Sequence, residues 1–390
     1  MIPYGRHSID DADVEAVTAV LRGGALTQGP KVEEFERAIA CRVGARHAVA
    51  VSSATAGLHI TALAAGMAPG RTLVTSPITF VASANAGLYC GGRIAFADIE
   101  ASTLNMSASS LEAAVHRSGG AQVIVPVHFG GLPCDMPAIK AVADRCGAHV
   151  IEDAAHAIGA THPDGSPVGS CRHSLCTVFS FHPVKNMAMG EGGVITTNDD
   201  AFFRHLLRLR SHGINKADDP LMDQAEALTD GVPNPWYYEM QELGFHYRVT
   251  DIQCALGLSQ LGRLDQFLAR RRELAARYDR AFKEFSNLRP AQPERRASSG
   301  LHLYVVRIDF KAAGLTRAQL MVRLRDRGVG TQVHYIPVTR HPLYRRLGFA
   351  GDSVPEADLY YAEGLSIPLY FGLRDDEQDR VIEALQELVG

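Results

Sequence analysis

The chain has 390 residues, of which 46% are hydrophobic and 21% charged, and 39 basic against 43 acidic side chains give a formal net charge of −4. This length exceeds the ~100 to 200 residues of a typical domain, so we expect two domains. The small negative charge provides no broad positive field for nucleic acid or anionic lipid. The N-terminus lacks the apolar stretch of a signal peptide, and no run approaches the ~18 apolar residues of a spanning helix. We therefore expect a cytoplasmic protein without nucleic acid or membrane partners.

The cysteines are odd in number, widely scattered and without a CxxC pair. No His or Cys pair completes a ligand set at metal-binding spacing, so we expect no metal site. We interpret the thiols as free and buried. They are Cys41, Cys90, Cys134, Cys146, Cys171, Cys176 and Cys254.

The first two thirds of the chain alternate short apolar runs with helical patterns, which indicates a parallel sheet with crossover helices. Helical stretches include residues 54–66 and 136–146. The seven runs are enough for one large sheet. We predict strands at 48–51, 72–75, 94–98, 122–127, 149–152, 177–181 and 193–197.

A different pattern begins near Thr250, where apolar residues at helical spacing predict one or two long helices. The remaining pattern predicts a smaller αβ domain. We divide the chain into a large domain (1–255) and a small C-terminal domain with its connecting helices (256–390). The elements expected in the small domain are strands at 302–308 and 331–338 and helices at 317–327 and 375–388.

The segment 216–239 contains prolines and acids but little periodicity. We expect it to leave the main body, either to cover a site or to reach a neighbouring molecule.

The strongest chemical motifs are IEDAAHAIG (151–159) and VFSFHPVKNMAMGEGG (178–193), each directly after an apolar strand. Ligands of open parallel sheets lie beyond the carboxyl ends of the strands, which brings Asp153 and Lys185 to one edge. A lysine can form an imine with an aldehyde cofactor and then move protons. A carboxylate facing the pyridine nitrogen keeps the ring able to absorb electrons, as pyridoxal phosphate sites require. Taken singly, a loop lysine such as Lys185 is far more often solvated than catalytic, and an acid at a strand end such as Asp153 is commonly a helix cap.

Three other segments fit such a site. In AVSSATAGLHI (50–60), free amides at a helix start and the Ser53 and Thr55 hydroxyls form a phosphate cradle, unless these residues are ordinary caps. In SPITFVASANA (76–86), Phe80 is placed to stack on a flat ring or to fill the core. The glycines of GEGG (190–193) either let another segment approach closely or form a plain turn.

Seven ordered motifs then resemble the DegT/DnrJ/EryC1/StrS family of sugar aminotransferases. Within that family, MIPYG, PITFVASAN, VHFGGLPCDM and FSFHPVK look like the branch that makes UDP-4-amino-4,6-dideoxy-N-acetyl-β-L-altrosamine for pseudaminic acid. The motifs are LTQGP (26–30), SSATAGLH (52–59), SPITFVASAN (76–85), IEDAAHAIG, VFSFHPVKNMAMGEGG, RSHGI (210–214) and GFHYRVTDIQCALGLSQL (244–261).

The resemblance implies a pyridoxal phosphate-dependent transferase of fold type I, with a mostly parallel seven-stranded sheet and a smaller C-terminal αβ domain. It also implies a homodimer with shared active sites. The cofactor positions it implies are Lys185 for the Schiff base, Asp153 at the pyridine nitrogen, His156 beside the ring, Phe80 stacked on it, and Ala54, Thr55 and Ser180 at the phosphate. The substrate positions are Tyr4, Gly24, Ala25, Leu26, Thr27, Gln332, Val333, His334 and Tyr335.

One position departs from the family pattern. Relatives read GxN[YF]R, and the asparagine contacts the cofactor phosphate of the neighbouring subunit, whereas this chain has His246 before Tyr247 and Arg248. A histidine can still donate one hydrogen bond there, or it turns away and water replaces it.

The function implied is transfer of the amino group of L-glutamate to the C4 ketone of a UDP-linked 4-keto-6-deoxy-N-acetylhexosamine. A different nucleotide 4-keto sugar, either a D-series UDP-sugar or one of the GDP-perosamine type, is the alternative. A non-catalytic pyridoxal phosphate-binding regulator is less favoured because no basic DNA-binding segment is evident. Arg6, Lys31 and Arg248 are candidates for the diphosphate by position only.

Overall fold

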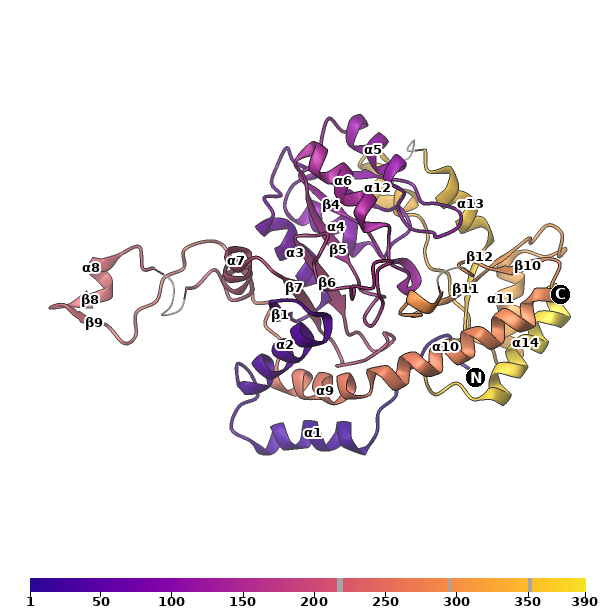
Figure 1. The fold of residues 1–390 in the computed structure, drawn as a ribbon, viewed down its shortest axis with the longest axis horizontal. Coiled ribbons are helices and arrows are strands. Elements are labelled where there is room, and N and C mark those ends of the chain that lie inside the picture. Colours follow the sequence, from indigo (N-terminus) through magenta and orange to yellow (C-terminus); the bar gives the residue numbers. More distant parts are fainter. Residues whose placement is uncertain (216–219, 294–295, 350–352) are drawn as a thin grey trace.

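The computed structural model describes residues 1–215, 220–293, 296–349 and 353–390. Figure 1 shows the main sheet in the middle of the molecule, enclosed by helices, with the C-terminal elements at one end and residues 220–240 projecting at the other. Within the described residues, no helix is long and apolar enough to cross a membrane.

The main sheet has seven strands in the order β1-β7-β6-β5-β4-β2-β3. β7 is antiparallel to both of its neighbours and the other pairs are parallel, which confirms the predicted α/β fold with a mostly parallel sheet. The strands are β1 (His47–Val51), β2 (Thr72–Thr75), β3 (Arg93–Phe96), β4 (Val123–Val125), β5 (His149–Asp153), β6 (Cys176–Ser180) and β7 (Gly193–Thr197).

Helices pack on both faces of this sheet, and side chains alternate between the two faces along each strand. Val178 of β6 belongs to a buried cluster with α3 and α7, whereas Phe179 packs with Phe35 of α2 on the opposite side. The helices are α1 (Asp11–Arg22), α2 (Pro30–Val43), α3 (Ala54–Ala64), α4 (Ala82–Tyr89), α5 (Ala108–Arg117), α6 (Met136–Cys146) and α7 (Asp200–Arg210).

The helix α3 is buried along most of its length, which fits its largely apolar sequence. Ser53 is its N-cap, and the Ser53 side chain accepts a hydrogen bond from the Ala56 amide at 3.1 Å. Gly57 brings it close to β6, because a Cβ there would lie 3.0 Å from Val178 Cγ1. The start of α3 is therefore held tightly against the sheet.

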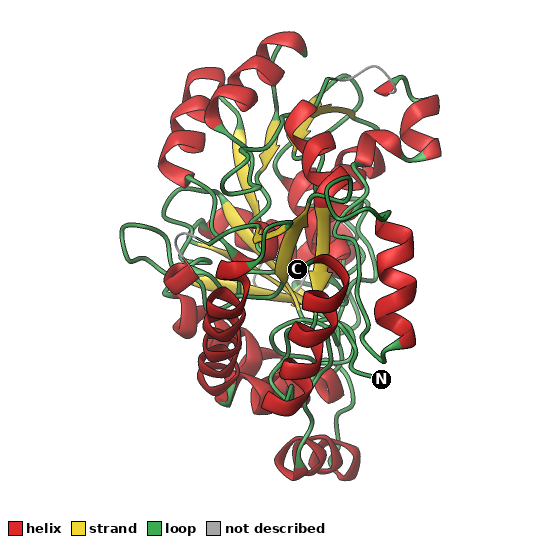
Figure 2. Ribbon diagram, turned by 90° about the vertical axis from the view of Figure 1, so that its right-hand side faces the viewer, coloured by secondary structure: helices red, strands yellow, loops and turns green. Residues whose placement is uncertain are grey.

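The C-terminal part contains two successive helices, a three-stranded antiparallel sheet in the order β10-β11-β12, and covering helices. Figure 2 looks onto this end of the molecule. Ile2 belongs to its hydrophobic cluster, so the N-terminus packs here too. The domain boundary at 255 remains a prediction. The elements are α9 (Asp251–Gly262), α10 (Leu264–Ala281), β10 (Leu288–Pro290), β11 (Tyr304–Ile308), α11 (Arg317–Asp326), α12 (Pro342–Arg346), α13 (Pro355–Glu363), β12 (Gly364–Ile367) and α14 (Asp375–Val389).

The predicted strand at 331–338 is wrong. Only Gln332 forms a bridge there, to Ser366. The amide of Val338 donates to the Pro77 carbonyl, and the carbonyl of His334 accepts from the Tyr360 hydroxyl. These backbone groups bond to a loop and a side chain, so no continuous ladder forms.

The strand predicted at 122–127 is shorter than expected and ends at Val125. Pro126 has no amide hydrogen to donate to a ladder. Val127 instead forms an isolated bridge with Asp153, which ties the two strand ends together.

All seven cysteines are free, but the expectation that all are buried is wrong. Cys41 is exposed, because α2 buries Phe35 and Ile39 and turns Cys41 outward. Cys90 and Cys146 are partly exposed.

Residues 216–219 of the segment 216–239 lie outside the described residues. The part from residue 220 onward projects from the body near the end of α7 and contains α8 (Gln224–Ala227), β8 (Leu228–Thr229) and β9 (Val232–Pro233) (Figure 1). It presents large apolar side chains to solvent, with Trp236 73% exposed.

Candidate active site

A cavity of about 420 Å³ lies at the carboxyl ends of β5 and β6 and extends to the start of α3 and to residues of the C-terminal part. Its position matches the strand-end rule used for the sequence. The predicted site residues in its wall are Tyr4, Ala54, Thr55, Phe80, Asp153, His156, Ser180, Lys185, His334 and Tyr335.

Lys185 lies in the loop after β6, in a turn closed by its amide donating to the His182 carbonyl at 2.8 Å. Its surroundings are poorly solvated, and this burial lowers the pKa of Lys185 to about 8 although the charge of Asp153 acts in the opposite direction. A substantial neutral fraction therefore exists near that pH. A neutral lysine amine can act as a nucleophile and a base. Lys185 is partly buried in the cavity wall and does not lie on the open surface.

Asp153 ends β5 and is 5% exposed. Its carboxylate accepts hydrogen bonds from the Ser83 hydroxyl at 2.6 Å and from the Ala155 amide at 3.1 Å. The chain after it forms turns, so Asp153 does not cap a helix. The two donors fix the carboxylate in the pocket.

His156 is held in one tautomer by its two neighbours. The Gly130 amide donates to Nδ1 at 3.3 Å, so Nε2 bears the hydrogen and donates to the Tyr335 hydroxyl at 3.2 Å. Burial, and then the charges of Lys185 and His334, lower the pKa of His156 well below its ordinary value. The ring is therefore a neutral, fixed wall of the pocket.

The start of α3 supplies free amide groups at Ala54 and Thr55, as an anion site requires. A Cβ on Gly193 would lie 2.7 Å from the Ala54 nitrogen and 2.8 Å from the Ser53 carbonyl carbon. Only glycine lets β7 pass so close to this cradle. Ser180, paired with Gly193 across β6 and β7, completes its rim. Ser53 is both a helix cap and part of the wall.

Phe80 is 59% exposed, so its interpretation as a core residue is wrong. Its ring lies in the pocket wall and is tilted toward Tyr335, with 6.4 Å between the ring centroids.

Several predicted substrate residues lie outside this wall. The loop between α1 and α2, which carries Gly24 to Thr27, is tied to the start of α9 by the Thr27–Thr250 bridge. His246 is exposed, and its ring meets that of His212 edge to face at 5.4 Å. Their contacts with the cofactor or substrate remain predictions. The residues outside the wall are Gly24, Ala25, Leu26, Thr27, His246, Gln332 and Val333.

The three residues proposed by position to bind the diphosphate lie in different places. Arg6 borders a small cavity that Lys185 also lines. Lys31 pairs with Glu34 at 2.6 Å, and Arg248 lines a different cavity beside α2 and α7. Arg6 alone of the three adjoins Lys185.

Some wall residues were not identified from the sequence. His302 was interpreted only as part of a strand, yet it lines the cavity, as do His182 and Glu191. Ser83 of the SPITFVASAN motif was not assigned a role, although its hydroxyl donates a hydrogen bond to the Asp153 carboxylate. Nothing in local spacing marks His302, because its place depends on how the C-terminal part packs on the sheet.

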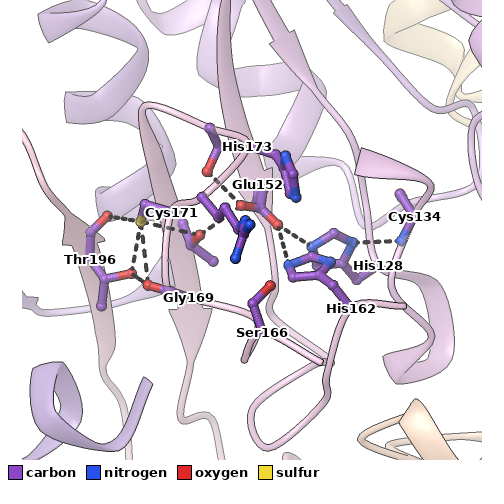
Figure 3. A network of polar contacts seen from close by, with 12 residues as sticks. His128, Cys134, Glu152, His162, Ser166, Gly169, Cys171, His173 and Thr196 are labelled. Atoms are coloured by element: carbon purple, nitrogen blue, oxygen red, sulfur yellow. Dashed lines mark hydrogen bonds and ion pairs between the residues drawn. The ribbon is translucent and has the colours of Figure 1, made fainter. Parts of the chain in front are cut away.

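Behind the site, a buried polar network surrounds Glu152 (Figure 3). Glu152 points to the opposite face from Asp153 because strand side chains alternate. It accepts hydrogen bonds from His128 Nε2 at 2.8 Å and from Thr177 Oγ1 at 3.1 Å, and lies 3.5 Å from His162 Nε2. The His128 amide donates to the Asp153 carbonyl at 3.1 Å. The network thus anchors the main chain that carries Asp153.

These groups fit pyridoxal phosphate. The amine of Lys185 suits its aldehyde, the carboxylate of Asp153 suits its pyridine nitrogen, and the amides at the start of α3 suit its phosphate. Because Gly193 has no Cβ, the space beside the Ala54 amide that a side chain would fill stays open. Fold and site together define a pyridoxal phosphate enzyme.

Comparison with known proteins gives the particular family. The model of the DegT/DnrJ/EryC1/StrS aminotransferase family matches residues 7–386, and the chain belongs to this family. The spore coat polysaccharide biosynthesis protein SpsC of Bacillus subtilis (strain 168) is 42% identical over 390 residues, covering 100% of this chain and 97% of SpsC.

Solved structures agree. Helicobacter pylori PseC, an aminotransferase involved in the biosynthesis of pseudoaminic acid, superimposes with a TM-score of 0.89 at 28% identity over 100% of this chain and 99% of PseC. Spr1654 of Streptococcus pneumoniae in its PMP form gives a TM-score of 0.88 at 28% identity over 100% of this chain and 99% of that one, and its PLP form is also similar. The protein is therefore a pyridoxal phosphate-dependent sugar aminotransferase.

Proposed function

We propose that the protein transfers the amino group of L-glutamate to the C4 ketone of a UDP-linked 4-keto-6-deoxy-N-acetylhexosamine, giving UDP-4-amino-4,6-dideoxy-N-acetyl-β-L-altrosamine for pseudaminic acid. The observation that carries the transamination is Lys185, an amine with a pKa lowered to about 8 at the wall of a cavity that also holds the carboxylate of Asp153. The similarity to PseC along the whole chain supports the sugar.

Pyridoxal phosphate, when bound, supplies an aldehyde that joins to amines and a ring that withdraws electrons from the reacting carbon. Lys185 Nζ would hold this aldehyde, and as a free amine it would remove the proton from the α carbon of the donor and supply a proton to the sugar carbon that receives the amino group. Asp153 would face the ring nitrogen and keep it protonated, and the amides of Ala54 and Thr55 would hold the phosphate.

The proposal includes a homodimer with shared active sites. The loop carrying Gly24 to Thr27 and the side chain of His246 are exposed and lie outside the cavity of their own chain. Trp236 and Met240 of the projecting segment, and Leu243 directly after it, are each at least 66% exposed. A second copy would cover these surfaces and bring His246 to the neighbouring site. A cytoplasmic location remains a prediction.

A different nucleotide 4-keto sugar is the second candidate. It is favoured by the 42% identity to SpsC, which is named for spore coat polysaccharide biosynthesis rather than for pseudaminic acid.

The test is incubation with L-glutamate and UDP-4-keto sugars of both C5 configurations, followed by NMR of the product. Amino transfer to the L-series UDP-sugar supports the proposal. Activity only on the D-series sugar, or only on a GDP-linked or non-acetylated sugar, would refute the pseudaminic assignment.

A further inference from the structure

An amino-acid donor brings an α-carboxylate to the pocket, and this anion must be held beside its amino group. The amino group reacts where Lys185 Nζ lies, so the carboxylate must be received by a side chain close to Lys185. No arginine is among the described residues that line the cavity. Within one chain, the wall of this cavity therefore offers the donor carboxylate a partner other than a guanidinium, the group that usually binds such anions.

Three histidines of the wall lie near enough to Lys185 for its charge to lower their pKa: His156, His302 and His334. Two of them have assigned hydrogen bonds. His156 uses both ring nitrogens, and His334 Nδ1 is bonded to the Ser366 hydroxyl at 2.8 Å.

His302 differs from both. It is 4% exposed, and its Nδ1 is enclosed without a hydrogen-bond partner. Among the described residues, its other ring nitrogen also has no partner in the protein. An enclosed N–H without an acceptor is more costly than an enclosed lone pair, so the neutral ring carries its hydrogen on Nε2. His302 thus keeps an unused donor in the wall of the cavity.

The ring is also firmly placed. The His302 amide donates to the Gly130 carbonyl at 2.9 Å, and its carbonyl accepts from Arg271 Nη1 at 3.3 Å. The ring packs on His156 with 4.4 Å between centroids. A donor held in this way binds an anion without first losing much conformational freedom.

We propose that His302 binds the α-carboxylate of the amino donor through Nε2. The assignment rests on the proposed transamination and adds the residue that selects an amino acid over a simple amine. The keto sugar has no such carboxylate, so His302 serves the donor half of the cycle.

The test is the dissociation constant of the holoenzyme for L-2-methylglutamate, a donor analogue with no α hydrogen to lose, measured by absorbance titration. His302→Phe keeps a ring against His156 but removes the N–H. It is expected to raise the dissociation constant roughly 10- to 100-fold, the effect of losing one hydrogen bond to a charged group. His302→Gln restores an N–H near Nε2 and should recover much of the affinity. His59→Phe, at a buried histidine outside the wall, is the matched control.

Affinity for pyridoxal phosphate, measured by titrating the cofactor-free proteins, should be unchanged in both His302 variants. An unchanged dissociation constant for the analogue in His302→Phe would overturn the assignment. So would a parallel loss of cofactor affinity, because His302 would then act only by shaping the cofactor pocket. A wild-type holoenzyme that responds to no amino acid would overturn the proposed function as well.

Discussion

Replacing Lys185 by methionine should stabilise the cofactor-free protein near neutral pH, although it removes the proposed reactive amine. Methionine has a similar length and flexibility but no charge. The folded protein must keep the Lys185 ammonium in surroundings that lower its pKa from 10.5 to about 8, and methionine avoids that penalty.

The sign and size of the stability difference follow from the pKa values of Lys185 in the folded and the unfolded chain. Below about pH 8, Lys185 is charged in both the folded and the unfolded chain, so the full penalty is present. Between about 8 and 10.5 the folded chain loses the proton first and the penalty falls, and above 10.5 it vanishes. At about 1.4 kcal/mol per pH unit the full penalty is about 3 kcal/mol. Water in the cavity reduces it, so we expect roughly 1 to 3 kcal/mol.

The assay is thermal and urea unfolding of cofactor-free wild type and Lys185→Met between pH 6.5 and 10.5. The control is Lys311→Met, at an exposed lysine. The stability difference from wild type should appear only for Lys185→Met, and it should shrink toward zero as the pH approaches 10.5. At pH 6.5 it corresponds to a rise in midpoint of a few °C, roughly 1 to 4 °C for a chain of this size. A variant that is less stable at pH 6.5, or a difference independent of pH, would refute the reasoning.

Three further predictions concern the surroundings of Lys185. Asp153→Asn should lower kcat at least ~100-fold while the unfolding midpoint stays close to that of wild type. Steady-state kinetics and unfolding curves check the two expectations. Near-normal turnover would contradict the role of the carboxylate. Gly193→Ala should weaken pyridoxal phosphate binding and destabilise the protein by roughly 1 to 3 kcal/mol, because the new Cβ meets the backbone at the start of α3. Cofactor titration and unfolding experiments check both effects. Gly372→Ala, where the new Cβ has open space around it, should show neither effect. Glu152→Gln should cost roughly 3 kcal/mol of stability, since it disturbs the buried pair with His128, and urea unfolding that matches wild type would show that the network contributes little.

The central part of the site was predictable from sequence because a simple rule governs it. Parallel strands end at one edge, so the positions of Asp153 and Lys185 after two neighbouring strands were enough to bring them together. The small residues at the start of α3 and the glycine at 193 followed from equally local requirements for free amides and close approach.

Other features depend on contacts that a local pattern does not contain. The segment 331–338 has strand-like residues, but its backbone bonds to a loop and to Tyr360, so tertiary packing overrides the pattern. Phe80 has a core-type side chain but faces the cavity. His302 lines the cavity only because the C-terminal part packs on the main sheet. The contact predicted for His246 with a neighbouring subunit stays a prediction.

The most direct test of the central claim is borohydride reduction of the purified holoenzyme followed by peptide mass spectrometry. We predict a visible absorbance band that shifts on reduction, with the cofactor fixed covalently to the peptide that contains Lys185. Lys185→Ala should show neither this label nor turnover. A label on a different lysine, or turnover by Lys185→Ala, would contradict the account.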